Sequence, residues 1–356
     1  MMKRVLTAIL AALPLFAVAA PSVVWLNPEY DFGSFSEDLG SVRCTFRGVN
    51  MGTEPVVVLA ARANCGCTVP TYPRVAVAPG DTITVDVEYQ ATGRPGRFSK
   101  NIYVDTSDGT KGRLKVKGIV VGNATTLASR FPIAVGDTRI SNTVVPFGRA
   151  TKGRLLSGSI TVYNSTANPI RPKALNLPPY INAVVRPEEI PAGDQGVISL
   201  TVATDQVDDW GTVTGGFTIQ PDAEAADTAR ISTVMILDED FSKLSRAELV
   251  EAPLLELSAM TVDLGHMTVD GGEATVEIGN SGKLPLMVRK VETASKVLDV
   301  TLSDKTVKRG KKGTLQVRTK AGALQPGGVV DERIVIRTND PTRAVNVIRV
   351  VGTVAK

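Results

Sequence analysis

Short runs in which apolar and polar side chains alternate dominate the chain. In Val42–Arg47 and in Thr82–Tyr89 every second residue is apolar, which is the pattern of a strand with one buried face. Comparable runs recur at 115–117, 159–163, 197–202, 231–236, 274–278, 314–318, 334–336 and 345–351. Helical periodicity is nearly absent. The pattern predicts an all-β protein built from short antiparallel strands.

Three landmarks recur in the same order at offsets of about 115 residues. An apolar residue followed by glycine opens each copy. An asparagine turn with a proline five positions later comes next, at a tight reversal that needs positive φ or a side chain that caps its own backbone. A glycine turn comes last. The landmarks are Phe32-Gly33, Asn50, Pro55 and Gly80, then Phe147-Gly148, Asn164, Pro169 and Gly193, then Leu264-Gly265, Asn280, Pro285 and Gly310. With about seven or eight strands per copy, they predict three tandem immunoglobulin-like β-sandwich domains.

The spacing of the copies sets the expected domain boundaries. We expect the first domain over residues 20–122, the second over 123–241 and the third over 254–356. A linker over 242–253 should contain a short helix at Ser245–Val250, because Ser245 and Glu248 match a capping box. The helix should end before Pro253.

The first residues have the pattern of a cleaved signal peptide. Lys3 and Arg4 precede an apolar run over Val5–Phe16, and Ala17-Val18-Ala19 provides the small residues of a cleavage site. We therefore expect residues 1–19 to be removed and the mature protein to be periplasmic or secreted. No cysteine stands at the cleavage site and no later segment is long and apolar enough to span a membrane, so neither a lipid anchor nor a transmembrane segment is expected.

Four motifs of the first copy resemble a known bacterial family. They are Phe32-Gly33, the turn from Asn50 to Pro55, Cys65-Gly66-Cys67-Thr68 and Pro79-Gly80. Together they resemble domain of unknown function 1573, which is common in secreted proteins of Bacteroidota and is similar in fold to Hydin-type (ASH) and PapD-like immunoglobulin domains. The third copy lacks the cysteine motif, and the second lacks both that motif and the glycine of the asparagine turn. The resemblance implies a fold and an extracytoplasmic location, but no established activity.

Three cysteines are the only chemically suggestive residues. Cys44 alternates with Val42 and Phe46, so it should face the core, whereas Cys65 and Cys67 follow a strand. Four interpretations are open: packed unreactive thiols, a structural disulfide from Cys44 to Cys65 or Cys67, a redox pair, or a soft-metal site. A bond across one residue should be strained, and three thiols without a nearby histidine make a poor zinc site. Packed thiols are therefore favoured, and no metal is expected.

No catalytic or cofactor-binding residues can be assigned. The chain has one histidine, His266 in the third copy, and lacks the usual nucleophile, metalloprotease and phosphate-binding motifs. We therefore expect no enzyme activity and no cofactor.

Charge is unevenly divided among the copies. Residues 242–356 carry 18 basic and 13 acidic residues, with much of the excess between Lys305 and Lys320. The basic density is too low for a nucleic-acid-binding protein, so nucleic acid is not an expected partner. This stretch is interpreted as a solvated face in preference to a functional basic patch.

These observations favour a structural or protein-interaction module of the cell envelope. Its partners would be other envelope proteins, bound by adding a strand to an exposed sheet edge. A glycan-binding or adhesive surface protein is one alternative, and a thiol–disulfide or metal-handling protein that uses Cys65 and Cys67 is another. The sequence does not indicate an oligomeric state.

Overall fold

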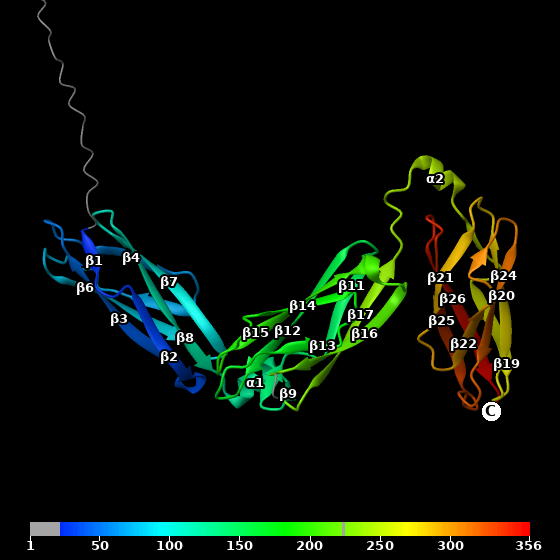
Figure 1. The fold of residues 1–356 in the computed structure, drawn as a ribbon, viewed down its shortest axis with the longest axis horizontal. Coiled ribbons are helices and arrows are strands. Elements are labelled where there is room, and N and C mark those ends of the chain that lie inside the picture. The colour runs from blue at the N-terminus through cyan, green and yellow to red at the C-terminus, as the bar shows by residue number, and fades with distance from the viewer. Residues whose placement is uncertain (1–21, 223–224) are drawn as a thin grey trace, which may run out of the picture. The chain divides into compact units, whose positions relative to one another are not determined.

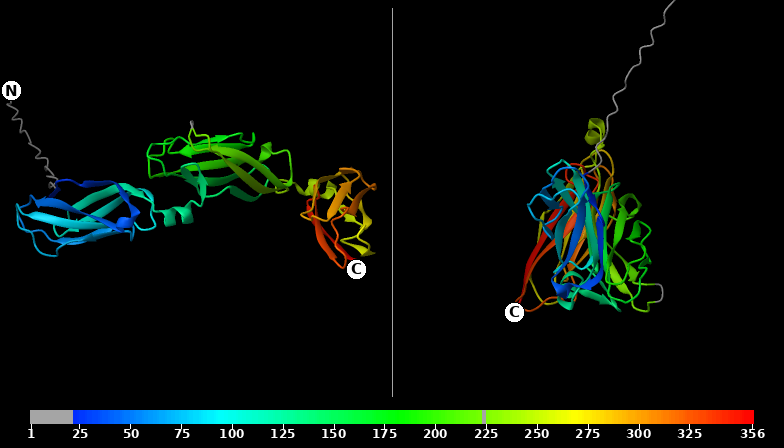
Figure 2. Two further views of the ribbon diagram at one scale, coloured as in Figure 1. Left: turned by 90° about the horizontal axis from the view of Figure 1, so that it is seen from below. Right: turned by 90° about the vertical axis from the view of Figure 1, so that its left-hand side faces the viewer.

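The computed structural model describes residues 22–222 and 225–356, and its strands form three tandem immunoglobulin-like β-sandwich domains joined by short segments (Figures 1 and 2). In each domain two sheets face one another across a separate hydrophobic core. The predicted signal peptide, residues 1–19, lies outside the described residues.

The first domain has one sheet of strand order β1-β3-β6-β5 and a second of order β2-β8-β7-β4. Its elements are β1 (Val23–Trp25), β2 (Glu29–Ser36), the 3-10 turn η1 (Glu37–Leu39), β3 (Ser41–Asn50), β4 (Val58–Ala63), β5 (Thr68–Thr71), β6 (Thr82–Gln90), β7 (Gly96–Thr106) and β8 (Lys111–Val121). The helix α1 (Ala124–Arg130) follows.

The second domain has sheets of order β14-β15-β12-β10-β9 and β11-β17-β16-β13. Its elements are β9 (Ile133–Val135), β10 (Thr138–Ile140), β11 (Val144–Thr151), β12 (Leu155–Asn164), β13 (Lys173–Leu175), β14 (Ile181–Arg186), β15 (Gln195–Ala203), the 3-10 turn η2 (Thr204–Gln206), β16 (Gly211–Gln220) and β17 (Ala229–Asp238).

The third domain has sheets of order β18-β20-β24-β22 and β19-β26-β25-β21-β23. Helix α2 (Arg246–Glu251) precedes it. Its strands are β18 (Leu255–Leu257), β19 (Thr261–Met267), β20 (Glu273–Asn280), β21 (Leu286–Glu292), β22 (Leu298–Leu302), β23 (Thr306–Val307), β24 (Lys312–Thr319), β25 (Val329–Thr338) and β26 (Val345–Val354).

Alternation of side chains along each strand produces these cores. In β6 the buried residues are Ile83, Val85, Val87 and Tyr89, each at most 2% exposed, and the residues between them point outward. Every alternating run identified in the sequence lies within a strand of the structure. The period-2 pattern therefore predicted the strands correctly, because one face of each sheet is buried.

The glycine that opens each copy lies at a bulge in a parallel strand pair. Gly33, Gly148 and Gly265 all have positive φ. The pairings of β2 with β8, β11 with β17 and β19 with β26 each shift register at that point. Glycine accommodates this backbone conformation without the steric cost of a Cβ.

Two helices connect the domains, and the sequence predicted one of them. Helix α2 begins after Ser245, and Ser245 and Glu248 form the expected capping box. Helix α1 was not predicted. It has no buried residue, so it lacks the apolar periodicity by which a helix is recognised. It begins after Asn123, whose side chain accepts a hydrogen bond from the amide of Thr126 at 2.9 Å.

The chain separates into two compact units. One contains residues up to Arg130 together with Gly193–Gln195, and the other contains the rest of the chain. The three hydrophobic cores lie within residues 23–120, 135–237 and 255–354. The residue boundaries of the three domains given above stay a prediction. Within the described part of the chain, no helix has the length and apolar character needed to cross a membrane.

Candidate functional site

The asparagine landmark of each copy is a buried hydrogen-bonding hub. Asn50, Asn164 and Asn280 are at most 2% exposed. The amide nitrogen of Asn50 donates to the carbonyl oxygens of Glu54 at 2.8 Å and Val77 at 3.0 Å, and its amide oxygen accepts from the backbone of Gly52 at 3.0 Å. The side chain thus joins its own turn to the loop that precedes β6.

The same three contacts recur in the other two copies. Asn280 donates to Leu284 at 2.9 Å and Val307 at 3.0 Å and accepts from Gly282 at 3.0 Å. Asn164 donates to the carbonyls of Asn168 and Ile190 and accepts from the amide of Thr166. The glycine turns at Gly80, Gly193 and Gly310 have positive φ. The repeated residues therefore serve the architecture.

Cys65 and Cys67 form a disulfide with a Cα–Cα distance of 5.3 Å. The favoured interpretation of Cys65 and Cys67 as packed free thiols is therefore wrong. So is the expectation that a bond across one residue is disfavoured, because this separation lies in the ordinary range for disulfides. Cys67 is 7% exposed, and Cys65 packs half-buried against the same core. No disulfide links either residue to Cys44, which is a free, buried thiol.

The disulfide lies where the chain crosses from one sheet to the other, between β4 and β5. The backbone oxygen of Cys67 accepts a hydrogen bond from the amide of Gln90 at 2.9 Å, which ties the crossing to β6. At the corresponding crossing of the third domain, Ser295 and Val297 donate backbone hydrogen bonds to the hydroxyls of Thr293 and Ser295, each at 3.1 Å.

The second domain crosses between its sheets in yet another way. Its crossing runs from β13 to β14 through Asn176, which has a φ of 56°, and through Pro178 and Pro179. Each copy thus fixes the same connection with different chemistry. This comparison favours a structural role for the Cys65–Cys67 disulfide.

Cys44 has the environment of an unreactive thiol. Its side chain faces the core as expected and is 8% exposed. Burial, with a smaller contribution from the Asp86 carboxylate, raises the pKa of Cys44 to about 11. With this raised pKa the Cys44 thiol is protonated near neutral pH. Because the thiolate is the nucleophilic form, Cys44 is unsuited to thiol exchange.

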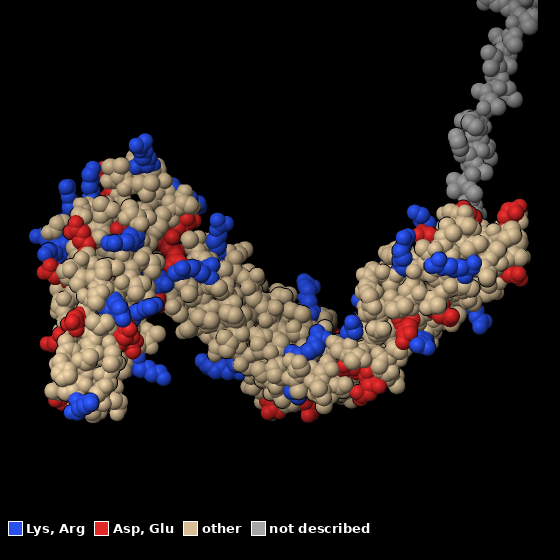
Figure 3. All heavy atoms as spheres, turned by 180° about the vertical axis from the view of Figure 1, so that it is seen from behind, with Lys and Arg blue, Asp and Glu red and all other residues tan. Residues whose placement is uncertain are grey.

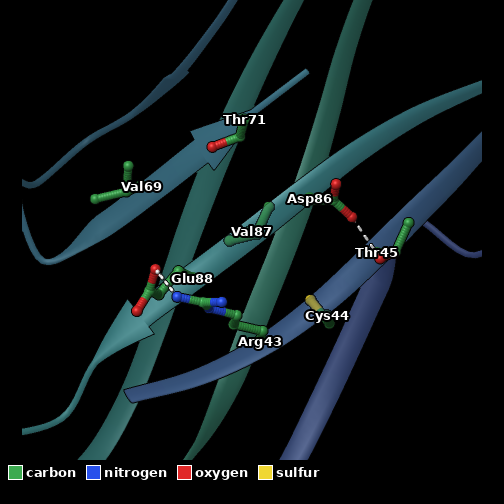
Figure 4. Close-up of a pocket in the computed structure, with 8 residues that line it drawn as sticks. All are labelled: Arg43, Cys44, Thr45, Val69, Thr71, Asp86, Val87 and Glu88. Atoms are coloured by element: carbon green, nitrogen blue, oxygen red, sulfur yellow. Dashed lines mark hydrogen bonds and ion pairs between the residues drawn. The ribbon is translucent and has the colours of Figure 1, made fainter. Parts of the chain in front are cut away.

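A shallow, open pocket lies on the outer face of the first domain, over β3, β5 and β6 (Figure 4). Arg43 pairs with Glu88, and Thr45 with Asp86, across the registered strands β3 and β6. Val69 and Thr71 of β5 complete the rim. These polar groups are satisfied by one another, and the pocket contains no activated nucleophile or base.

The single histidine and Trp210 also contact other residues of the chain. His266 is exposed and lies 2.9 Å from the hydroxyl of Thr353. The ring of Trp210 is contacted by Lys152 at 4.2 Å and Arg289 at 5.0 Å. Among the residues that the structure describes, no group of three or more His, Cys, Asp or Glu side chains could hold a metal ion.

Sheet edges are the remaining candidate interaction surfaces, and the corresponding edge differs among the copies. In the first domain β5 contains Pro70, which lacks an amide donor. In the third domain β22 carries Asp299 on its exposed face, 3.8 Å from Lys320. In the second domain β14 pairs with β15 in unbroken register over six residues, and it contains no proline, bulge or lysine.

Comparison with protein families gives one match. The model of the family described as "Protein of unknown function (DUF1573)" matches residues 23–120 and 255–354. These two ranges span the first and third sandwiches. Among curated proteins, no sequence matches the chain.

Several solved structures are similar to the chain at low sequence identity. A protein of unknown function from Porphyromonas gingivalis W83 is 19% identical with a TM-score of 0.46, over 61% of this chain and 100% of that one. The periplasmic chaperone SfaE is 15% identical with a TM-score of 0.24, over 61% and 99%. The ASH / PapD-like domain 7 of human CEP192 is 12% identical with a TM-score of 0.25, over 33% and 99%.

Proposed function

Because the chain belongs to the domain of unknown function 1573 family, whose two matches cover more than half of its residues, we propose that it is a non-enzymatic structural or protein-interaction module of the cell envelope. The observation that carries this proposal is the role of the repeated residues. The opening glycines, the buried asparagines and the glycine turns all hold the sandwiches together. What varies among the copies is the surface.

The binding mode that we propose is strand addition at the free edge of β14. A regular edge strand offers unpaired backbone donors and acceptors to an extended peptide. Asn182, Val184 and Arg186 are its exposed residues, and Val184 is 39% exposed. The equivalent edges of the other copies are shorter templates, since β22 pairs with its neighbour over five residues and β5 over four, and β5 also contains a proline.

A charge placed on this edge tests the proposal. Val184→Lys should abolish a crosslinked partner captured by the wild-type protein in the envelope of the source bacterium, because an exposed lysine discourages strand pairing. Thr71→Lys on β5 is the matched control and should leave the crosslink intact. If both variants retain the crosslink, β14 is not the binding edge. If both lose it, the effect is not specific to that edge.

A thiol–disulfide function is the second candidate, and the Cys65–Cys67 bond is the observation that favours it. Cys65 is only partly buried, so a thiol could reach its sulfur. Exchange would require a thiolate to attack one sulfur and release the other. Incubation of the purified protein with glutathione buffers of defined ratio tests this candidate. Rapid equilibration of the bond would support it, and resistance to exchange while the domain stays folded would exclude it.

A glycan-binding function has less support. Sugar-binding surfaces commonly use exposed aromatic rings, and the chain has two tryptophans. Trp25 lies over Gly48, where a Cβ would come within 3.1 Å of its ring. Trp210 is covered by the two cationic side chains described above. Both tryptophan rings are thus engaged in contacts within the chain, and the exposed aromatic rings among the described residues are those of Tyr30 and Tyr103.

A further inference from the structure

The glycine turn before β24 carries a cluster of cations that the other two copies lack. This turn follows Val307 and reads Lys308-Arg309-Gly310-Lys311-Lys312. The corresponding segments read Ala78-Pro79-Gly80-Asp81 in the first copy and Pro191-Ala192-Gly193-Asp194 in the second.

The fold itself does not require these cations. The amide of Gly310 donates to the carbonyl of Asn280 at 2.9 Å, and the amide of Gly80 donates in the same way to Asn50 at 2.7 Å. The first copy therefore builds the same turn with alanine, proline and aspartate at the positions of Lys308, Arg309 and Lys311. The basic side chains are an addition to a turn that is complete without them.

Three of the cations are available to a ligand. Lys308, Arg309 and Lys311 are exposed, and none forms an ion pair with another residue in the described ranges 22–222 and 225–356. Two nearby carboxylates are already engaged, since Glu277 pairs with Lys312 at 2.7 Å and Glu251 with Lys283 at 2.6 Å. Glu256 also lies near Lys312, but with three exposed cations that form no ion pair, this end of the third domain still has an excess of positive charge.

Exposed apolar side chains lie at the same end of the domain. Val250 of α2 is 64% exposed, and Leu284 of the Asn280 turn is 51% exposed. The amide of Leu284 donates to the carbonyl of Glu251 at 2.9 Å, so the end of α2 is fixed beside the turn. Asn280 in turn is bonded to Gly310. Figure 3 shows Lys and Arg side chains projecting from the upper part of the third domain, at the left of the view.

The geometry points to this surface, formed by α2, the Asn280 turn and the Lys308–Lys312 turn, as a docking site for a bilayer that carries anionic headgroups. The cations match the headgroup charge, and each adds to binding within a Debye length of the surface. Leucine and valine side chains beside the cations would enter the interface between headgroups and acyl chains. A soluble polyanion would use the cations and leave these apolar side chains without a partner. The site is independent of the strand edge proposed above.

Vesicle flotation tests the inference with the mature full-length chain. The wild-type protein should bind vesicles of 30% phosphatidylglycerol and 70% phosphatidylcholine, bind pure phosphatidylcholine weakly, and dissociate as salt rises. The variant Lys308→Gln/Arg309→Gln/Lys311→Gln should lose about 100-fold in partition coefficient. Leu284→Ser should lose several-fold without a change in charge. Unchanged thermal unfolding of each variant would show that folding is intact.

A matched variant separates this site from general charge effects. Arg47→Gln/Arg74→Gln/Lys111→Gln removes the same charge from exposed positions of the first domain, and it should bind the vesicles as the wild type does. Equal loss in both triple variants would overturn the inference. So would binding to dextran sulfate without binding to vesicles, which would identify a soluble polyanion as the ligand, or no binding to either.

Discussion

The side-chain amide of Asn280 donates a hydrogen bond to the backbone oxygen of Val307, with a nitrogen–oxygen distance of 3.0 Å. The pair joins the turn after β20 to Val307 at the end of β23. Val77 and Ile190 are the corresponding acceptors in the other two copies. One buried side chain per sandwich thus closes one end of the domain, and its loss should be costly.

Replacing this asparagine tests its contribution. Asn280→Ala leaves the carbonyls of Leu284 and Val307 without their donor, so it should lower the free energy of unfolding of the third domain by about 2–4 kcal/mol. Asn64→Ala is the control because Asn64 is exposed, and its effect should stay within about 0.5 kcal/mol. Urea denaturation measures both. Equal effects would mean that the hub is not a principal support.

Glycine in the asparagine turn is needed for space, and the cost should differ between copies. Neither Gly52 nor Gly282 has positive φ. The asparagine turn is therefore fixed by the asparagine side chain that caps its own backbone, and not by a positive φ at the glycine. A Cβ on Gly282 would lie 2.5 Å from the amide nitrogen of Leu254 and 2.6 Å from the Cα of Pro253. On Gly52 the nearest atoms, both in side chains, lie at 3.0 and 3.1 Å.

Alanine substitution should therefore destabilise the protein more at Gly282 than at Gly52. Gly282→Ala should cost about 1–3 kcal/mol, because backbone must move to admit the methyl group, and Gly52→Ala should cost less. Denaturant midpoints of the two variants, each compared with the wild type, provide the measurement. The reverse order would show that the close approach at Gly282 is relieved at little cost.

Glu37 should make the first domain sensitive to acid. It is 2% exposed. Burial alone would raise its pKa, but hydrogen bonds from the Gly93 amide, the Thr126 hydroxyl and the Asn123 amide outweigh burial and lower the pKa. A carboxyl whose folded pKa is lowered adds stability above its unfolded pKa of about 4.3, and this stability is lost as pH falls through the folded value.

The Glu37→Gln variant isolates this effect. Near pH 7 it should be less stable than the wild type, and the difference should shrink as pH falls below about 4. Thermal unfolding followed across this pH range supplies the test. A constant difference would mean that Glu37 stabilises the domain through packing and not through its charge.

The hydrogen bonds of Glu37 also lead us to expect that α1 belongs to the first folding unit. Glu37 accepts hydrogen bonds from the Asn123 amide at 3.1 Å and the Thr126 hydroxyl at 2.8 Å, which fix the start of α1. A fragment of residues 22–130 should therefore fold cooperatively and unfold at a higher temperature than a fragment that ends at residue 122. Identical melting of the two fragments would place the boundary before α1.

The cysteines should differ in reactivity. In native protein Cys44 should resist a thiol reagent at pH 8, because burial raises its pKa to about 11. Unfolding without reductant should release one thiol, and unfolding with reductant should release three. Cys65→Ala/Cys67→Ala should cost about 2 kcal/mol, since the disulfide closes a very short loop. A fast-reacting thiol in the native protein would argue against a purely structural role.

The sequence predicted the strands and the three sandwiches because burial of one sheet face imposes the period-2 pattern seen in Thr82–Tyr89. It also located the asparagine turns. It did not indicate that Asn50 reaches Val77, since hydrogen bonds between distant segments leave no local pattern. Helix α1 was missed for a related reason: its position depends on contacts with Glu37. The Cys65–Cys67 bond was misjudged because a general rule about strain was applied without the backbone conformation.

The glycine turn bonded to each asparagine has a practical consequence for protein engineering. Two features of this turn are common to the three copies: a glycine with positive φ, and a backbone oxygen that accepts a hydrogen bond from the asparagine side chain. The residues between these two points already differ completely among the copies, as Ala78-Pro79, Pro191-Ala192 and Lys308-Arg309. Foreign dipeptides grafted there should be displayed on a rigid frame, which makes the chain a natural scaffold for presenting short binding sequences.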